Sequence, residues 1–182
     1  MADTKISALT AATTPLAGTE EVAIVQSSTT KRVAVSDITN FAAMRLENTD
    51  TTTSINTASL TEIPLATATS FGTGFTQSTN AIQTDFAGTI ELTASIRTEG
   101  TVVRSAIGCE FFKNGTSLGP RYNSSYVRAT GGHNEANTIC APYIVTCADG
   151  DLFAVRGIQE AVSGTVDMGF AGSSYLQAKR LA

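Results

Sequence analysis

The chain has 182 residues, of which 42% are apolar and 15% are charged, and its formal net charge is −4. Lys and Arg cluster only as pairs and no apolar run approaches the ~18 residues that span a bilayer, so we expect neither a nucleic-acid nor a membrane partner. The first residues lack a secretory signal and the three Cys are an odd number, which excludes a full disulfide framework and indicates synthesis in a reducing compartment.

Two short apolar runs lie near the start of the chain, at residues 22–25 and 32–35. Both consist of β-prone residues and their connection is short and polar, which predicts a β-hairpin. Because an isolated two-stranded hairpin is only marginally stable in water, we expect it to rest on another surface. Residues 1–37 are therefore predicted to form a small N-terminal β-hairpin arm.

The spacing of apolar residues changes over residues 36–47. Ser36 is suited to cap a helix, and the residues after it repeat at helical spacing. The apolar residues on the shared face are Ile38, Phe41, Ala42 and Leu46. We expect a short helix here, followed at residues 48–59 by a polar linker or an extended arm without periodicity.

From residue 60 onward, short alternating segments separated by turn residues predict strands. The clearest is Thr89–Arg97, which alternates strictly. Its inward residues are predicted to be Ile90, Leu92, Ala94 and Ile96. A second segment, Ala106–Lys113, runs into Asn114-Gly115, and both of these residues tolerate the positive φ of a hairpin turn.

Three further segments complete this part of the chain. Residues 137–147 alternate, Asp149-Gly150 should turn the chain into a strand at residues 151–156, and residues 165–181 are strand-like but interrupted by glycines. On the first segment we expect one face to carry Ile139, Ala141, Tyr143 and Val145. Regularly spaced short strands with turn signals predict an all-β sandwich or barrel.

Candidate catalytic and metal-binding residues are few. His133 is the single histidine and no motif frames it, so we interpret it as a loop residue. Cys109, Cys140 and Cys147 match no zinc spacing and are expected to be buried free thiols, with a Cys140–Cys147 disulfide as the alternative. Residues 149–151 could offer two carboxylates to calcium, although a tight turn explains them more simply. We therefore expect neither an enzyme nor a bound metal or cofactor.

The turn motifs of the C-terminal part occur in a characteristic order. They are Phe86-Ala87-Gly88-Thr89, Lys113-Asn114-Gly115, Ala148-Asp149-Gly150-Asp151 before LFAVRG, and a closing GFAGSSYLQAKRL. This succession, over roughly residues 60–182, resembles the jelly-roll head of the tumour necrosis factor and complement-type globular superfamily. The resemblance implies a jelly-roll β-sandwich and, because members of that superfamily are generally homotrimers, a homotrimer.

Aromatic residues are enriched at the cores of protein interfaces, which makes four residues of the head candidates for the trimer axis. They are Tyr143, Phe153, Tyr175 and Leu176. The same residues are equally suited to the interior of each sandwich, and both roles stay open at this point.

The N-terminal arm carries a second resemblance. Residues 5–38 contain Ile-Ser-x-Leu, an Ala-rich step, Leu-x-Gly-Thr, a strand ending in Gln and a Thr-Lys-Arg-Val strand. This pattern resembles a segment at the start of many tailed-bacteriophage virion proteins, and it implies an anchor on the particle. The apolar anchor residues would be Ile6, Leu9, Leu16, Val22, Ile24, Val33 and Val35.

Together these resemblances lead to the hypothesis of a bacteriophage capsid decoration protein, of the cement or head-fibre type, made in the host cytoplasm. Residues 1–37 would attach to the major capsid protein at the capsid surface, residues 38–59 would form the short helix and linker, and residues 60–182 would form the trimeric head. The alternative is a tail-fibre or receptor-binding tip that recognises a host surface glycan or protein. A third possibility is a bacterial trimeric jelly-roll protein outside any phage.

Overall fold

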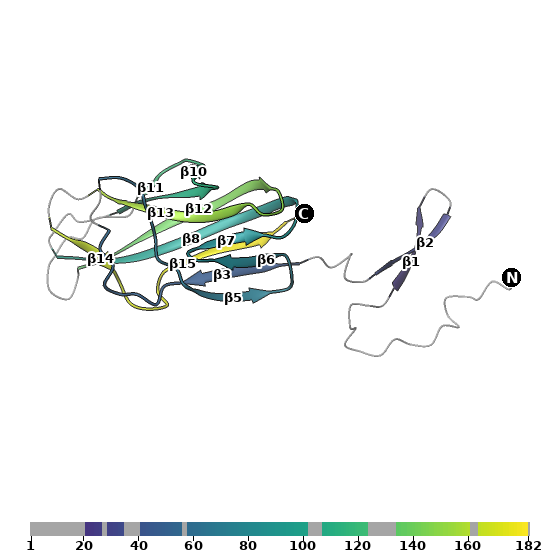
Figure 1. Cartoon of the computed structure of the whole chain (residues 1–182), viewed down its shortest axis with the longest axis horizontal. Coiled ribbons are helices and arrows are strands. Elements are labelled where there is room, and N and C mark those ends of the chain that lie inside the picture. Colours follow the sequence, from purple (N-terminus) through teal and green to yellow (C-terminus); the bar gives the residue numbers. More distant parts are fainter. Residues whose placement is uncertain are drawn as a thin grey trace. The chain divides into compact units, whose positions relative to one another are not determined.

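The computed structural model describes residues 21–26, 29–34, 41–55, 58–101, 107–123, 134–160 and 164–181, with side chains from residue 41 onward. The chain divides into two compact units, Met1–Asn40 and Phe41–Ala182. The described residues form strands and turns (Figure 1), and none of them belongs to a helix that is long and apolar enough to cross a membrane.

The first unit contains the predicted hairpin. Strand β1 (Glu21–Gln26) pairs antiparallel with β2 (Thr29–Ala34), and Gln26 lies opposite Thr29. The connection is therefore two residues long, which is the commonest length for a tight hairpin. Both strands are longer than the apolar runs that predicted them.

The second unit is a sandwich of two antiparallel sheets (Figure 1). One sheet has the order β10-β9-β13-β7-β6, with β11 beside β9 and β4 beside β13; the other has the order β12-β8-β15-β3-β5, with β14 beside β8. The seven-stranded sheet consists of β4 (Thr61–Glu62), β6 (Phe75–Ser78), β7 (Ala81–Thr84), β9 (Ile107–Lys113), β10 (Thr116–Ser117), β11 (Tyr122–Asn123) and β13 (Leu152–Gln159). The six-stranded sheet consists of β3 (Ala43–Glu47), β5 (Thr67–Phe71), β8 (Gly88–Gly100), β12 (Glu135–Cys147), β14 (Val166–Met168) and β15 (Tyr175–Arg180).

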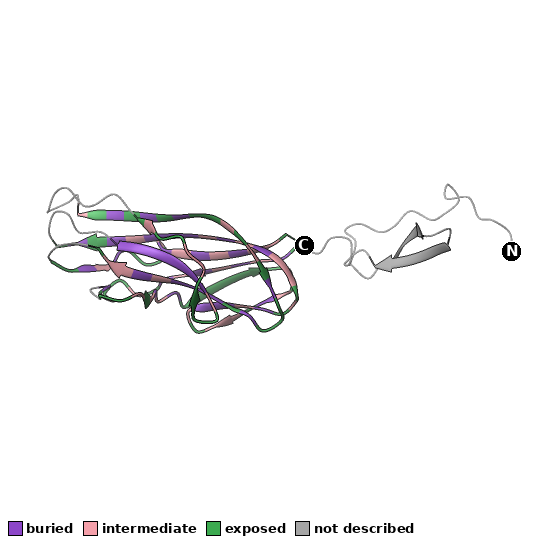
Figure 2. Ribbon diagram, turned by 90° about the horizontal axis from the view of Figure 1, so that it is seen from above, coloured by how far each residue is buried: buried purple, intermediate pink, exposed green. Residues whose placement is uncertain are grey.

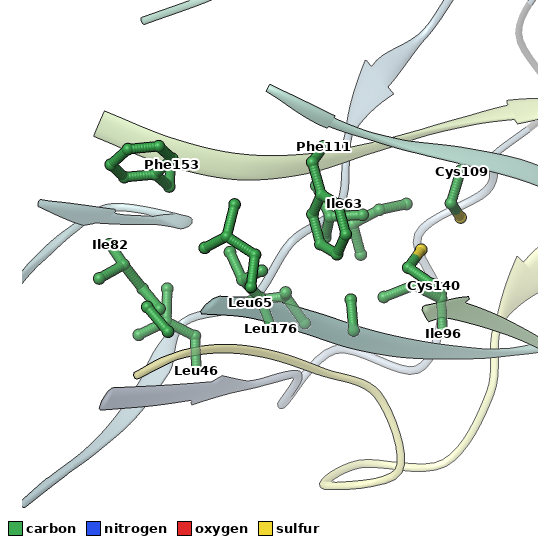
Figure 3. Packing of buried hydrophobic residues seen from close by; sticks show 14 of the residues in the cluster. Leu46, Ile63, Leu65, Ile82, Ile96, Cys109, Phe111, Cys140, Phe153 and Leu176 are labelled. Atoms are coloured by element: carbon green, nitrogen blue, oxygen red, sulfur yellow. The ribbon is translucent and has the colours of Figure 1, made fainter. Parts of the chain in front are cut away.

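The core lies between the two sheets and is built on the alternation of β8. Buried residues are interspersed with more exposed ones along the strands of the sandwich (Figure 2), and on β8 the four predicted inward residues are all confirmed as buried. They belong to one hydrophobic cluster with Phe111 of β9 and with Phe153 and Val155 of β13 (Figure 3). The prediction of an all-β sandwich is therefore confirmed.

The helix predicted over residues 36–47 is wrong, because residues 43–47 form strand β3. Ala42, Met44 and Leu46 are buried while the residues between them are partly exposed, which is the period of a strand. Strand β3 pairs with β15 on one side and with β5 on the other, so sheet hydrogen bonds replace helical ones. Tertiary pairing here overrides a local sequence of good helix formers.

The first part of the predicted linker, residues 48–55, packs on the sandwich. Asn48 is buried, accepts a hydrogen bond from the Ser174 N–H (2.9 Å) and donates one to the Phe170 carbonyl (3.2 Å). Ile55 is also buried, and its N–H donates to the Val166 carbonyl (2.7 Å). The compact unit therefore begins at Phe41 and not at residue 60.

The face of β12 expected from the sequence is correct for only half of the strand. Ile139 is 66% exposed, whereas Cys140 is buried. The register against β8 shifts between Cys140 and Tyr143, which marks a β-bulge, and such an extra residue moves the following side chains to the other face. The inward residues are Ala136, Thr138 and Cys140 before the bulge and Tyr143, Val145 and Cys147 after it.

Two turns of the head are tied together by Asn114 and Asp151. Asn114 and Gly115 have φ of 50° and 79°, which confirms the predicted hairpin turn. The Asn114 amide donates to one Asp151 carboxylate oxygen (2.7 Å), while the other accepts from the Ala148 N–H (2.7 Å) and pairs with Lys113 (2.7 Å). Burial, the largest effect, raises the pKa of Asp151, but these hydrogen bonds and the Lys113 charge together lower it below its ordinary value.

We expect Leu46→Ala to lower the free energy of unfolding by about 2–5 kcal/mol, because a fully buried side chain is lost. The adjacent change Glu47→Ala removes a partly exposed ion pair with Arg45 and should cost less than about 1 kcal/mol. Guanidinium unfolding at one protein concentration measures both. Equal losses would contradict the alternation of β3.

We expect Asp151→Asn to destabilise the protein at pH 7 by roughly 1–3 kcal/mol, because hydrogen bonds to a charged carboxylate are lost. A carboxyl with a lowered folded pKa stabilises the fold above its unfolded pKa, about 3.9, and loses that contribution as the pH falls through its folded pKa. The difference in Tm from the unmodified protein should therefore shrink below about pH 4. Thermal unfolding from pH 7 to pH 3 measures it, with the exposed neighbour Asp149→Asn as the control. A difference that does not change with pH would contradict a role for the charge.

Candidate functional site

The outward face of the six-stranded sheet carries exposed apolar side chains at both of its edges, and we call it the open sheet face. On the edge strand β12, Ile139 and Ile144 are 66% and 63% exposed. At the opposite edge, Phe71 of β5 is 67% exposed and contacts Phe41, with ring centroids 5.5 Å apart. Contiguous exposed apolar residues are typical of an interaction surface, so each of the two edges is a candidate contact.

The register of the strands places these residues in two rows across the open sheet face. One row runs from Ile139 through Ser95 and Tyr175 to Glu47. The other runs from Ile144 through Glu91, Lys179 and Ala43 to Phe71. Each row therefore begins with an isoleucine on β12 and continues through mainly polar residues, and the second row reaches Phe71 on the opposite edge strand β5.

Two cations of the open sheet face stack on aromatic rings. The Arg45 guanidinium lies 4.0 Å from the centroid of the Tyr175 ring, and the Lys179 ammonium lies 5.8 Å from that of Phe41. Such cation–π contacts attract each cationic group to the face of its ring. Both of these cations therefore have an aromatic partner within the same chain.

A hollow of about 490 Å³ lies at the end of β8 and β12, lined by Arg97, Glu135, Ala136, Asn137 and Ser173. Arg97 and Glu135 form an ion pair across the two strands. The side-chain amide oxygen of Asn137 accepts a hydrogen bond from the Ser95 hydroxyl (2.8 Å). The hollow offers polar donors and acceptors without a free charge, which suits a neutral polar ligand.

The outward face of the seven-stranded sheet carries an acidic cluster that is internally satisfied. Glu110 accepts hydrogen bonds from the Ser117 hydroxyl (2.6 Å) and from Arg121 (2.8 Å), and Arg121 also pairs with Glu160 (3.5 Å). The hydrogen bond from Ser117 is the largest cause of the lowered pKa of Glu110. Both oxygens of Glu110 are occupied, so this cluster fastens the segment after β10 to β9.

The residues proposed as the anchor lie in the first unit. Val22 and Val33 occupy opposite positions of the hairpin, and Ile24 lies opposite Lys31. Four anchor residues lie outside the described residues, namely Ile6, Leu9, Leu16 and Val35. Their role as an anchor stays a prediction.

The four candidates for the trimer axis separate into two groups. Phe153 and Leu176 have no exposed surface within one chain, so they fill the interior of the sandwich. Tyr143 packs against the same core and donates its hydroxyl to the Leu118 carbonyl (3.1 Å). Tyr175 lies on the open sheet face, and it is the candidate whose position suits a contact between copies.

The three cysteines are buried free thiols, as predicted. Cys140 and Cys147 lie seven positions apart on one strand, roughly 23 Å at ~3.3 Å per residue, which contradicts a disulfide between them. Cys147 lies instead near the Phe86 carbonyl (3.7 Å).

The other candidates for chemistry are placed as follows. His133 lies outside the described residues. Residues 149–151 form the predicted tight turn, with Gly150 at a φ of 84° and the Asp151 carboxylate occupied by protein donors. Within the described ranges, no group of three or more His, Cys, Asp or Glu side chains is placed to hold a metal ion.

Sequence reasoning missed four residues of the open sheet face, namely Phe41, Phe71, Ile139 and Ile144. Phe41 was assigned to the predicted helix, and Ile139 was placed on the same face as Tyr143 because the bulge was not foreseen. Pro142 within the predicted strand was the available signal, since proline in a strand is found at edges and bulges.

No protein-family model and no curated protein matches this chain. Solved structures do: crystal structures of murine APRIL at pH 8.0 and pH 5.0 are 11% and 13% identical, and each covers 78% of this chain and 99% of its own at a TM-score of 0.53. Eiger TNF from S. frugiperda is 13% identical and covers 78% of this chain and 92% of its own, with a TM-score of 0.51. At this identity the similarity shows the fold alone. The sandwich of this chain is a tumour necrosis factor-like jelly roll.

Proposed function

We propose that this protein is a bacteriophage capsid decoration protein, of the cement or head-fibre type, made in the host cytoplasm. It is a homotrimer that binds the major capsid protein through its N-terminal arm. The observation that carries the proposal is the division of the chain into a hairpin unit, Met1–Asn40, and a jelly-roll unit, Phe41–Ala182. The hairpin unit contains the segment that resembles virion proteins, residues 5–38.

The role is one of binding and not of catalysis. A marginal hairpin binds weakly by itself, but a trimer presents three of them to neighbouring capsid subunits at once. Linked binding of this kind raises the overall affinity by about 10²–10⁴-fold without any new contact. The jelly-roll heads then supply the trimer and remain on the capsid surface.

The open sheet face supports the trimer. Its two apolar edges differ, with isoleucines on β12 and the Phe41–Phe71 pair at β5. An interface that joins two different patches repeats from copy to copy, and it closes into a ring when the rotation allows. In the proposed trimer, β12 of each copy packs on the open sheet face of the next, with Tyr175 in the contact.

A receptor-binding tip is the second candidate function. The polar hollow at Arg97, Glu135 and Asn137 is the observation that favours it, because glycans are neutral and rich in hydrogen-bonding groups. In that case the head would bind host cells and the arm would attach to a tail fibre. The capsid-binding experiment below separates the two candidates.

We expect the unmodified protein to sediment at roughly 57 kDa, three times the 18.9 kDa of one chain, at micromolar concentration. Ile139→Lys should shift it to a single chain, because a charge would be buried in the contact between copies. Leu152→Lys is the matched control: Leu152 is also exposed but lies on the other sheet. A monomeric unmodified protein, or equal dissociation by both variants, would refute the proposed trimer contact.

We expect the full-length protein to bind capsids that lack it and to raise their heat resistance. The double variant Val22→Asp, Val33→Asp should lose binding, because two like charges directly opposite each other destabilise the hairpin. The control Val22→Thr, Val33→Thr keeps β-prone residues and should still bind. Co-sedimentation with capsids measures binding for all three proteins.

The same experiment includes host cells. If no protein binds capsids while all three bind cells, the receptor-binding candidate replaces the decoration role. If none binds either target, the protein functions outside the phage particle.

A further inference from the structure

Cys109 and Cys140 face each other across the interior of the sandwich. Cys109 belongs to β9 of the seven-stranded sheet, and Cys140 belongs to β12 of the six-stranded sheet. Figure 3 shows their sulfur atoms pointing toward one another. The two thiols are close enough to share a hydrogen bond, and neither has a bonded partner sulfur.

The two cysteines lie on strands of different sheets, at the same edge of the sandwich. Strand β12 is the last strand of its sheet, and β9 lies next to the end of the other sheet, beside β10 and β11. A covalent bond between them would join the two sheets along the edge of the sandwich. Bridges between the two sheets of a β-sandwich are established in immunoglobulin domains.

We propose that Cys109 and Cys140 form a disulfide between the two sheets when the protein folds in an oxidising medium, while Cys147 remains a thiol. Cys147 is excluded because it lies at the far end of β12, against the Phe86 carbonyl. The proposal is independent of the capsid role, since it concerns the interior of the head alone.

The bond forms by thiol–disulfide exchange with a small disulfide such as oxidised glutathione. The thiolate of one cysteine attacks a glutathione sulfur and releases one glutathione thiolate; the second cysteine then attacks the mixed disulfide and releases the other. Two protein thiols are oxidised to one disulfide, and one glutathione disulfide is reduced to two glutathione thiols that take up the two protons.

Burial decides when this exchange takes place. Both side chains are at most 2% exposed, so glutathione cannot reach either sulfur in the folded chain. The hydrogen bond with Cys140, followed by desolvation, raises the pKa of the Cys109 thiol, which keeps it protonated and unreactive at neutral pH. The exchange therefore proceeds during folding or opening of the head, and the completed bond is protected from reduction once the sandwich has closed.

The test is to refold the full-length chain from denaturant with either reduced glutathione alone or a mixture of oxidised and reduced glutathione. The samples are quenched in acid, alkylated under denaturing conditions, and analysed by intact mass and peptide mapping. We expect three alkylated thiols after reduced refolding. After oxidised refolding we expect one, on Cys147, with the Cys109 and Cys140 peptides joined.

The bond should also raise Tm by about 5–10 °C, because it closes a loop of about 30 residues. After oxidised refolding, Cys140→Ala should have two alkylated thiols, on Cys109 and Cys147, and its Tm should not rise. The control Cys147→Ala should have no alkylated thiol, because Cys109 and Cys140 are joined, and its Tm should still rise. Three alkylated thiols in the oxidised, folded protein, or a bond that includes Cys147 or a second chain, would overturn the proposal. Peptide mapping of the unmodified chain decides the question even if the Cys140→Ala variant fails to fold.

Discussion

The pairing of β8 along both of its edges is the constraint on which the head depends. Strand β8 pairs with β12 on one side and with β15 on the other, and β15 in turn carries β3 and β5. A slip of one residue in β8 would turn its buried aliphatic side chains outward and bring glutamates and Arg97 into the core. Its strict alternation therefore determines which face of the whole six-stranded sheet is covered and which face remains open.

The few Lys and Arg side chains of the head contact aromatic rings as well as forming ion pairs. Six of the seven Lys and Arg side chains that the structure describes lie 4.0 to 5.9 Å from the centroid of an aromatic ring. Phe112 shows the consequence: it lies on the outward face of its sheet, yet it is buried, with the Arg156 guanidinium 4.4 Å from its ring centroid. Aromatic residues in this fold thus cover the sheet surfaces as well as filling the core, which is why an aromatic residue alone does not identify an interface.

The parts of the fold that could be predicted from sequence are those that local chemistry decides. Asn114-Gly115 forms its turn because both residues tolerate positive φ, and β8 was visible because apolar and polar residues alternate without a break from Thr89 to Arg97. The predictions from sequence fail where contacts between residues far apart in the chain determine the structure. Residues 43–47 combine good helix formers, but β15 and β5 supply strand partners on both sides. The open sheet face could not be assembled from sequence, because its rows depend on the register between strands and on the bulge in β12.

That bulge also interrupts β12, which is an edge strand of 13 residues. A long regular edge offers unpaired backbone groups to any passing strand, and proteins interrupt such edges with bulges and proline. Here Pro142 lacks an N–H, and the shift in register around it bends the ladder. The edge is therefore poorly suited to strand addition, while Ile139 and Ile144 remain exposed on either side of it. Any contact that the proposed trimer makes through this edge would therefore use packed side chains rather than backbone pairing.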